Sequence, residues 1–276
     1  SIGRVDGDEL NDLIISENAG ESGIDGEPSN VGAVYVLPGV VDGWPDVETA
    51  TPYYGDQYLG RYGETMAAVG DVTGDGIRDI AVRASHHHED GTRAGRTFVI
   101  SGADGLQYPL NFPGLPAGHR FGMATSAADL NGDGRAELVV SASQYPAQGT
   151  QHRAGAAWLF TWQDGEMNHE PTLEYDYSNF RHSTDDFFGR TLRFGDFDGD
   201  QQVDLLISSA GEEIHADFIG PVLEGPDDSF TDEELAWFDE YSRDGECQSV
   251  RESGAVFVYD HDDLLVPDRG PTHIFY

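Results

Sequence analysis

The sequence predicts an all-β repeat protein, and three observations support that prediction. A segment that begins at Ser1 with "SIGRVDGDELNDLIIS" returns in similar form from Ala68, Ala127 and Arg193. After each copy comes a glycine, followed by a short run of β-branched, aromatic and small apolar residues. These runs are bounded by Gly, Pro, Asp and Asn, which is typical of strands separated by turns.

The copies recur at the length of a four-stranded blade. The first positions of their acidic loops are 67, 58 and 67 residues apart, and they are Arg4, Asp71, Asp129 and Asp196. This period is longer than that of helical repeats and predicts a β-propeller of four-stranded antiparallel blades. We expect one domain with repeats at residues 1–57, 58–116, 117–183 and 184–276.

Two further signals keep the same phase. An aromatic-Gly pair precedes three of the loops by eight or nine residues, as Tyr62-Gly63, Phe121-Gly122 and Phe188-Gly189. The glycine-led runs are "GAVYV" from Gly32, "GRTFVI" from Gly95, "GAAWLF" from Gly155 and "GAVFVY" from Gly254. Each run predicts a strand. The first repeat lacks the aromatic-Gly pair, and the closing "PTHIFY" predicts an outer strand.

The acidic loops place oxygen-bearing residues at alternating positions. Positions 1, 3, 5 and 9 are Asp71, Thr73, Asp75 and Asp79 in the second loop, Asp129, Asn131, Asp133 and Glu137 in the third, and Asp196, Asp198, Asp200 and Asp204 in the fourth. Position 7 offers the backbone carbonyls of Ile77, Arg135 and Gln202. Calcium takes six to eight oxygen ligands, so these loops predict structural calcium sites with no open position for a substrate.

The first loop departs from this pattern. Asp6, Asp8 and Asp12 occupy positions 3, 5 and 9 with the Leu10 carbonyl at position 7, but Arg4 stands at position 1. A guanidinium pairs well with carboxylates, so Arg4 is an alternative to a metal ion in this loop. We therefore expect three to four calcium ions in the chain.

Two other interpretations of the loops are an EF-hand and a set of solvated turns without a metal. An EF-hand requires Glu at position 12, where this chain has Val82, Val140 or Ile207 inside apolar runs, so the EF-hand is excluded. The remaining alternative is that the acidic residues only decorate solvated turns. Phased triplets of acidic residues favour calcium over that alternative.

This combination of motifs resembles the FG-GAP repeat of the integrin α-subunit propeller and its bacterial relatives. The resemblance covers nearly the whole chain and implies that each loop joins the two inner strands of a blade and binds calcium. It also implies a ring of seven blades, whereas four repeats are visible. The sequence therefore predicts either a closed four-blade ring or part of a larger propeller, and an incomplete ring would favour self-association.

The last repeat contains a long acidic insertion at residues 211–253. Thr231 precedes Glu234 by three residues, as in a capping box, and Leu235, Phe238 and Tyr241 lie near helical spacing, so we expect one short helix. Long loops on a rigid scaffold often bind partners, which makes the insertion a candidate recognition element. The alternative is an acidic lid packed on its own blade.

The composition argues against several function classes. The net charge is −36, from 51 acidic and 15 basic residues, and every basic residue is Arg. Such a surface repels nucleic acid and anionic lipid. Cys247 is the only cysteine, so no internal disulfide is possible. No apolar run approaches the roughly 20 residues of a membrane span, so we expect no membrane insertion. The sequence begins without a basic segment followed by an apolar one, so we expect that any secretion signal has been removed or was never included.

No catalytic motif is recognisable, so we expect no enzyme activity. The chain has no G-x-S-x-G, no H-E-x-x-H and no phosphate-binding Gly-Lys loop, and the acidic loops use nearly all the regularly spaced acidic pairs. The run His86, His87, His88 and Glu89 predicts a polar inter-strand loop rather than a transition-metal site, because adjacent strand residues point to opposite faces.

The predicted function is that of a calcium-binding, integrin-α-like adhesion or protein-recognition module. The expected location is extracellular or at the cell surface, because cytosolic calcium is usually too scarce for such sites, and the expected partner there is a protein or glycan. One alternative is a carbohydrate-binding propeller that uses Trp44, Trp162 and Trp237, with Trp158 in the core. A second alternative is a non-catalytic domain of a secreted hydrolase or lyase.

Overall fold

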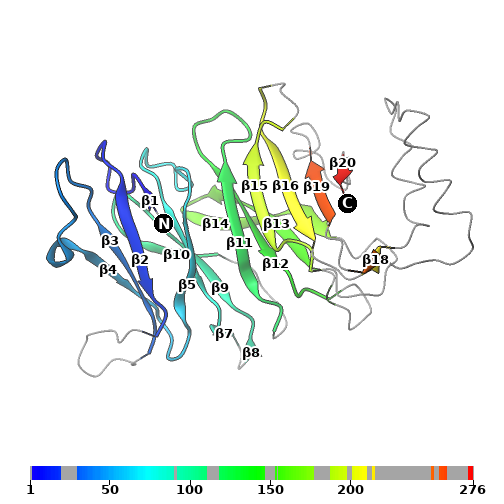
Figure 1. The fold of residues 1–276 in the computed structure, drawn as a ribbon, viewed down its shortest axis with the longest axis horizontal. Coiled ribbons are helices and arrows are strands. Elements are labelled where there is room, and N and C mark those ends of the chain that lie inside the picture. The colour runs from blue at the N-terminus through cyan, green and yellow to red at the C-terminus, as the bar shows by residue number, and fades with distance from the viewer. Residues whose placement is uncertain are drawn as a thin grey trace, which may run out of the picture.

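Four four-stranded antiparallel sheets make up the fold of the computed structural model (Figure 1), which confirms the predicted all-β propeller architecture. The structure describes residues 2–19, 30–89, 92–110, 118–146, 153, 155–176, 187–197, 201–209, 213–214, 250–251, 255–259 and 273–275. The predicted helix and most of the insertion at 211–253 lie outside these residues.

In each sheet the strands are ordered as in the chain. Sheet 1 contains β1 (Ile2–Gly3), β2 (Asp12–Glu17), β3 (Ala33–Leu37) and β4 (Thr51–Tyr54). Sheet 2 contains β5 (Tyr62–Ala68), β6 (Ile80–Ala84), β9 (Arg96–Ile100) and β10 (Gln107–Pro109). Sheet 3 contains β11 (Phe121–Ala128), β12 (Glu137–Ala142), β13 (Ala156–Gln163) and β14 (Glu166–Asp176). Sheet 4 contains β15 (Thr191–Gly195), β16 (Asp204–Ser209), β19 (Ala255–Tyr259) and β20 (His273–Phe275).

Smaller elements lie in the connections. A single 3-10 turn covers Val47–Thr49. The strands β7 (His88–Glu89) and β8 (Thr92–Arg93) form one two-stranded ribbon, and β17 (Glu213–Ile214) pairs with β18 (Val250–Arg251) in another. The second ribbon holds the two ends of the insertion together. Within the described part of the chain, no helix is long and apolar enough to span a bilayer.

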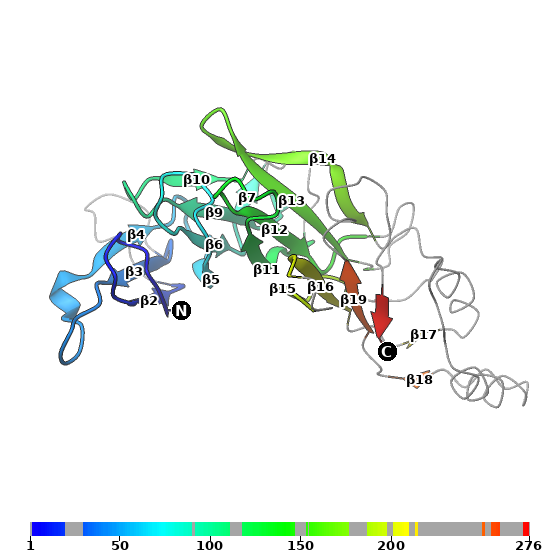
Figure 2. The same ribbon diagram turned by 90° about the horizontal axis from the view of Figure 1, so that it is seen from above.

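The sheets stand face to face in a row, with sheets 1 and 4 at opposite ends (Figures 1 and 2). The first strands of neighbouring sheets, β5, β11 and β15, pack against one another. The described sheets therefore form an open arc. These described sheets do not close into a four-blade ring, which was one of the two arrangements that the sequence left open.

The core consists of three apolar layers, one between each pair of neighbouring sheets. Alternation along β6 explains how one strand serves two layers: Ile80 and Val82 face sheet 1, whereas Ala81 faces sheet 3. The layer between sheets 2 and 3 contains Trp158, which is 1% exposed, as predicted from its position in a strand.

Motif glycines bring neighbouring sheets into close contact. Gly32, just before β3, has φ of +86°, and a Cβ there would lie 2.2 Å from the carbonyl oxygen of Tyr62 in the next sheet. The relation recurs between Gly155 and Phe188, again at 2.2 Å. Only glycine permits this approach. The aromatic-Gly pair of one repeat contacts the glycine-led strand of the repeat before it. This contact explains why the two motifs recur together along the sequence.

Candidate metal centres

One hydrogen bond closes the acidic loop in all four sheets. The carboxylate at position 9 begins or directly precedes the second strand, is almost fully buried, and accepts a hydrogen bond from the backbone N–H at position 2. The donor and acceptor residues are Val5 and Asp12, Val72 and Asp79, Leu130 and Glu137, and Phe197 and Asp204, each pair at 2.8 Å. The loop is thus tied to the buried edge of its sheet.

A second segment, which the sequence did not reveal, also reaches the loops. The N–H of Gly39 donates to Asp12 at 2.9 Å, and the N–H of Gly102 donates to Asp79 at 3.0 Å. The Ser101 hydroxyl donates to Asp75 at 2.7 Å. Each of these glycines lies two residues beyond the end of the third strand, in "LPG" and "ISG". That shared position is a signal that a sequence search could use.

The aspartate at position 1 organises the turn. Asp71 accepts hydrogen bonds from the N–H groups of Gly74 at 2.7 Å, Asp75 at 3.0 Å and Gly76 at 2.7 Å. Asp129 accepts from the equivalent residues of the third loop, Gly132, Asp133 and Gly134. A guanidinium has no acceptor, so Arg4 cannot play this part in the first loop.

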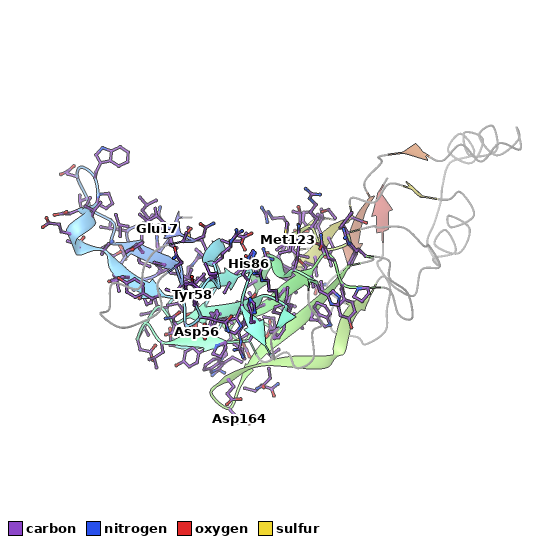
Figure 3. The ribbon with its side chains drawn as sticks, turned by 90° about the horizontal axis from the view of Figure 1, so that it is seen from below. Glu17, Asp56, Tyr58, His86, Met123 and Asp164 are labelled. Atoms are coloured by element: carbon purple, nitrogen blue, oxygen red, sulfur yellow. The ribbon has the colours of Figure 1, made fainter. Side chains whose placement is uncertain are left out.

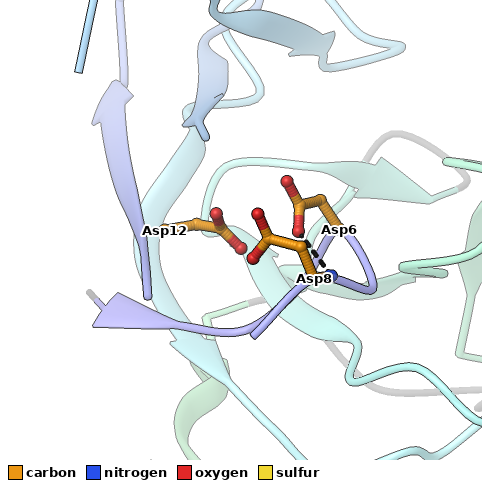
Figure 4. Close-up of side chains that lie close together, drawn as sticks. All are labelled: Asp6, Asp8 and Asp12. Atoms are coloured by element: carbon orange, nitrogen blue, oxygen red, sulfur yellow. Dashed lines mark hydrogen bonds between the residues drawn. The ribbon is translucent and has the colours of Figure 1, made fainter. Parts of the chain in front are cut away.

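Carboxylates converge in the first two loops. Ligand oxygens of Asp6, Asp8 and Asp12 lie within 4.8 Å of one another, and those of Asp71, Asp75 and Asp79 do likewise. Figure 4 shows the three side chains of the first loop directed toward one another, with the N–H of Asp8 donating to Asp6 at 3.1 Å. In the described part of the chain, Arg4 forms no ion pair with this cluster, so the structure does not place the guanidinium where it would replace an ion.

The side chain at position 3 lies between the carboxylates at positions 5 and 9. The Thr73 hydroxyl is 2.9 Å from Asp75 and 3.4 Å from Asp79. In the third loop, the Asn131 amide nitrogen is 3.3 Å from Asp133 and 3.1 Å from Glu137. The side chains at positions 3, 5 and 9 are therefore neighbours in these two loops.

The fourth loop is described only at its ends. Asp196 accepts a hydrogen bond from the N–H of Gln201 at 3.0 Å, and Asp204 is buried. Asp198 and Asp200 lie outside the described residues. The ligand roles of the four position-7 carbonyls, on Leu10, Ile77, Arg135 and Gln202, stay predictions.

The surroundings of three loop carboxylates disfavour their charged form, whereas those of Asp75 favour it. Burial, together with the charges of Asp12 and Asp8, raises the pKa of Asp6. Burial raises the pKa of Asp79 to about 6 and also raises that of Glu137. Burial acts in the same direction on Asp75, but hydrogen bonds from Ser101, Ile77 and Thr73 outweigh it and lower the pKa of Asp75. A bound cation would relieve the cost at the three raised groups.

Without calcium, the free energy of unfolding should fall as the pH rises from about 4 to about 6. The pKa of Asp79 is 3.8 in the unfolded chain and about 6 in the fold. Protonated Asp79 favours the folded state, and this contribution to the free energy of unfolding is fully present below pH 3.8. It is lost as the pH rises through the pKa of the folded state, by about 3 kcal/mol in total. Urea unfolding in EDTA, followed by circular dichroism at several pH values, measures this loss.

Saturating calcium provides the control for the pH series. The ion binds the deprotonated carboxylate, so the fall in stability over the same range should largely disappear. Equal pH dependence with calcium and with EDTA would contradict the assignment of Asp79 as a ligand.

The three adjacent histidines have separate partners. His87 is buried and lies 3.3 Å from Asp56, and this hydrogen bond lowers the pKa of Asp56. His86 contacts the Ser85 hydroxyl at 2.9 Å, and His88 accepts from Arg93 at 3.2 Å. Figure 3 shows Asp56 and His86 near the junction of sheets 1 and 2. These contacts fit the predicted polar inter-strand role.

The tryptophans offered as sugar-stacking residues differ in exposure. Trp44 is 90% exposed. Trp162 lies in β13 and not in an exposed loop as expected: it is half-buried and packs edge-on against Tyr108 with ring centroids 4.7 Å apart. Trp237 lies outside the described residues.

Four four-stranded sheets repeat along the chain, each with an acidic loop between its first and second strands, which is the architecture of a β-propeller. A model of the FG-GAP repeat matches residues 62–100 and 121–160, which confirms that the chain carries FG-GAP repeats. These matches cover sheets 2 and 3, apart from their outer strands.

Relatives of two kinds support the same class. Integrin alpha-5 of Xenopus laevis is 28% identical over 210 residues, which cover 71% of this chain and 19% of the integrin. Integrin alpha-PS2 of Drosophila melanogaster is 32% identical over 156 residues, 50% of this chain and 11% of the relative. Phosphatidylinositol-glycan-specific phospholipase D of Mus musculus is 30% identical over 163 residues, 54% of this chain and 18% of the relative. The matched part is thus less than a fifth of each relative.

Proposed function

We propose that this chain is a calcium-stabilised propeller that serves as an extracellular adhesion or protein-recognition module. The observation that carries the proposal is the convergence of three carboxylates in each of two loops, at positions repeated through four sheets. The integrin relatives support a recognition role, and the expected partner is a protein at the cell surface.

Calcium fits the donor set of the loops. Carboxylate, hydroxyl and amide oxygens are hard ligands, which suit calcium rather than zinc or copper. Burial, to which the charges of neighbouring carboxylates add, raises the pKa values of Asp6 and Asp79, and a bound cation would offset that cost. We infer three to four structural ions, one in each loop that retains enough ligands.

An extracellular location follows from the calcium proposal. Free calcium in the cytosol is scarce, and only sites of high affinity fill there, whereas extracellular modules work at millimolar concentrations. An excess of 36 negative charges also attracts divalent cations from the surrounding solution.

A second candidate function is that of a non-catalytic domain attached to a hydrolase. The relative that supports it is the phospholipase D of Mus musculus, of which this chain matches 18%. A carbohydrate-binding role is supported by the exposure of Trp44. Both alternatives share the calcium-stabilised scaffold and differ in the ligand.

Binding to arrays separates these functions. The whole chain, loaded with calcium, is applied to immobilised cell-surface proteins and to glycans, with EDTA-treated protein as the control. Calcium-dependent binding to proteins is the expected result. A glycan signal that disappears in Trp44→Ala would replace the proposal with the carbohydrate-binding alternative, and no protein signal would contradict the recognition role. A variant lacking residues 211–253, checked for retained calcium binding, tests the insertion as the recognition element.

A further inference from the structure

A backbone hydrogen bond joins the second acidic loop to the third. The N–H of Ala136, at position 8 of the third loop, donates to the backbone carbonyl of Asp71, at position 1 of the second, at 2.7 Å. Among the described residues, no other backbone hydrogen bond connects two acidic loops. Asp71 is therefore held at two points. The third loop binds its carbonyl, and N–H groups of its own turn bind its carboxylate.

Packing fixes the two loops against each other around this hydrogen bond. Ala136 is 7% exposed and belongs to the apolar layer between sheets 2 and 3. Gly70 lies directly before the second loop, and a Cβ there would lie 2.6 Å from the Cβ of Ala136. The Arg135 side chain covers the turn of the second loop, because a Cβ on Gly74 would lie 2.7 Å from its Cζ. A shift in the backbone of the third loop is therefore transmitted to the second.

The peptide group between Arg135 and Ala136 has one polar atom for each loop. Its carbonyl oxygen is at position 7 of the third loop, where the sequence predicts a calcium ligand, and its N–H binds the second loop. The C=O and N–H of a planar trans peptide point in opposite directions. A cation at the carbonyl oxygen polarises the whole peptide group and makes its N–H a stronger donor. An ion in the third loop would thus strengthen the hydrogen bond that holds Asp71.

We propose that the Arg135–Ala136 peptide group positions Asp71 and couples the calcium sites of the second and third loops. This coupling rests on the proposed calcium function. Because coupling between two sites is reciprocal, an ion in either loop raises the affinity of the other. The first loop differs. The Ile77 side chain lies beside Gly7, but no described backbone hydrogen bond joins the first loop to the second, so the first loop fills independently.

Backbone amide signals in NMR spectra of the whole chain can show which loop fills with calcium. Gly74 reports on the second loop and Gly132 on the third, so titrating EDTA-stripped protein with calcium chloride gives an affinity for each. Asp133→Asn weakens the third site, while its side-chain oxygen can still accept the N–H of Arg135. At calcium concentrations that leave the third loop empty, the affinity of the second should be about fivefold lower than in the wild type.

Asp8→Asn in the first loop is the matched control. Asp8 and Asp133 are both exposed, both stand at position 5, and each accepts the N–H of the residue two positions on. Asp8→Asn should leave the affinity of the second loop unchanged. In EDTA, the Gly74 signal should be the same in both variants as in the wild type, which shows that the empty second loop is undistorted.

Reciprocity supplies a second test. Asp75→Asn in the second loop should lower the affinity of the third by the same factor. Arg135→Leu removes the guanidinium and keeps the peptide group, so the coupling should persist, and its loss would overturn the role of the peptide group. Calcium binding to both loops with independent affinities would overturn the coupling alone. Amide signals that do not respond to calcium would overturn the calcium proposal and the coupling with it.

Discussion

Removal of calcium is expected to lower the free energy of unfolding by several kcal/mol. A ligand that binds only the folded chain contributes about 2.7 kcal/mol per site at a hundredfold excess over its dissociation constant, and three loops carry an oxygen-bearing side chain at each of positions 1, 3, 5 and 9. Calorimetric titration of EDTA-stripped protein should find three to four ions, and thermal unfolding should show a large rise in Tm on reloading. No binding and no rise in Tm would contradict the calcium proposal.

Two variants of the second loop distinguish the loss of a bound calcium ion from the loss of fold stability. Asp79 accepts hydrogen bonds from the N–H groups of Val72, Thr73 and Gly102, so Asp79→Ala leaves these buried donors without their acceptor. It should cost about 2–4 kcal/mol even in EDTA and also remove one calcium ion. Asp75→Ala should remove the same ion at a smaller cost in EDTA, because Asp75 is exposed. Equal losses in EDTA would contradict the clamping role of Asp79.

Replacement of Gly155 by alanine should destabilise the contact between sheets 3 and 4 by about 3 kcal/mol or more. The new Cβ would lie 2.2 Å from the carbonyl oxygen of Phe188 and 2.6 Å from its nitrogen. Both atoms belong to the backbone, so no side-chain rotation relieves the overlap. Urea unfolding in saturating calcium measures the effect.

Gly165 provides a closely matched control for that substitution. Its φ is +86°, against +84° at Gly155, and a Cβ there would have nothing within 4 Å. Gly165→Ala therefore pays only the cost of the left-handed backbone, about 1 kcal/mol. Similar losses in the two variants would show that strain in φ, and not the approach of neighbouring sheets, explains the motif glycine.

The features that recur in every repeat could be predicted from the sequence. The phase of the motifs located the acidic loops and the third strands, and alternation within the run that contains Trp158 placed this residue in the core. It missed Ser101, Gly39 and Gly102, because these residues reach the loops from another connection and their role exists only in three dimensions.

The arrangement of the four sheets could not be predicted from the sequence either, because it also depends on contacts in three dimensions. Whether four repeats close into a ring depends on the angle between successive sheets. Small differences in side-chain packing determine that angle, and no sequence motif indicates it. For the first loop, the sequence left open whether Arg4 replaces a metal ion. Its carboxylates converge although Arg4 occupies position 1, because Asp12 is held by two backbone N–H groups that do not depend on that position.

The hydrogen bond from position 2 to position 9 means that the loops are preorganised. Because this closure uses only the protein's own atoms, the entropy of shaping the loop is lost during folding and not when an ion arrives. The first loop keeps this closure although Arg4 stands at position 1. Blades that depend on a metal and blades that do not can thus coexist in one propeller, and each can change from one kind to the other by single substitutions.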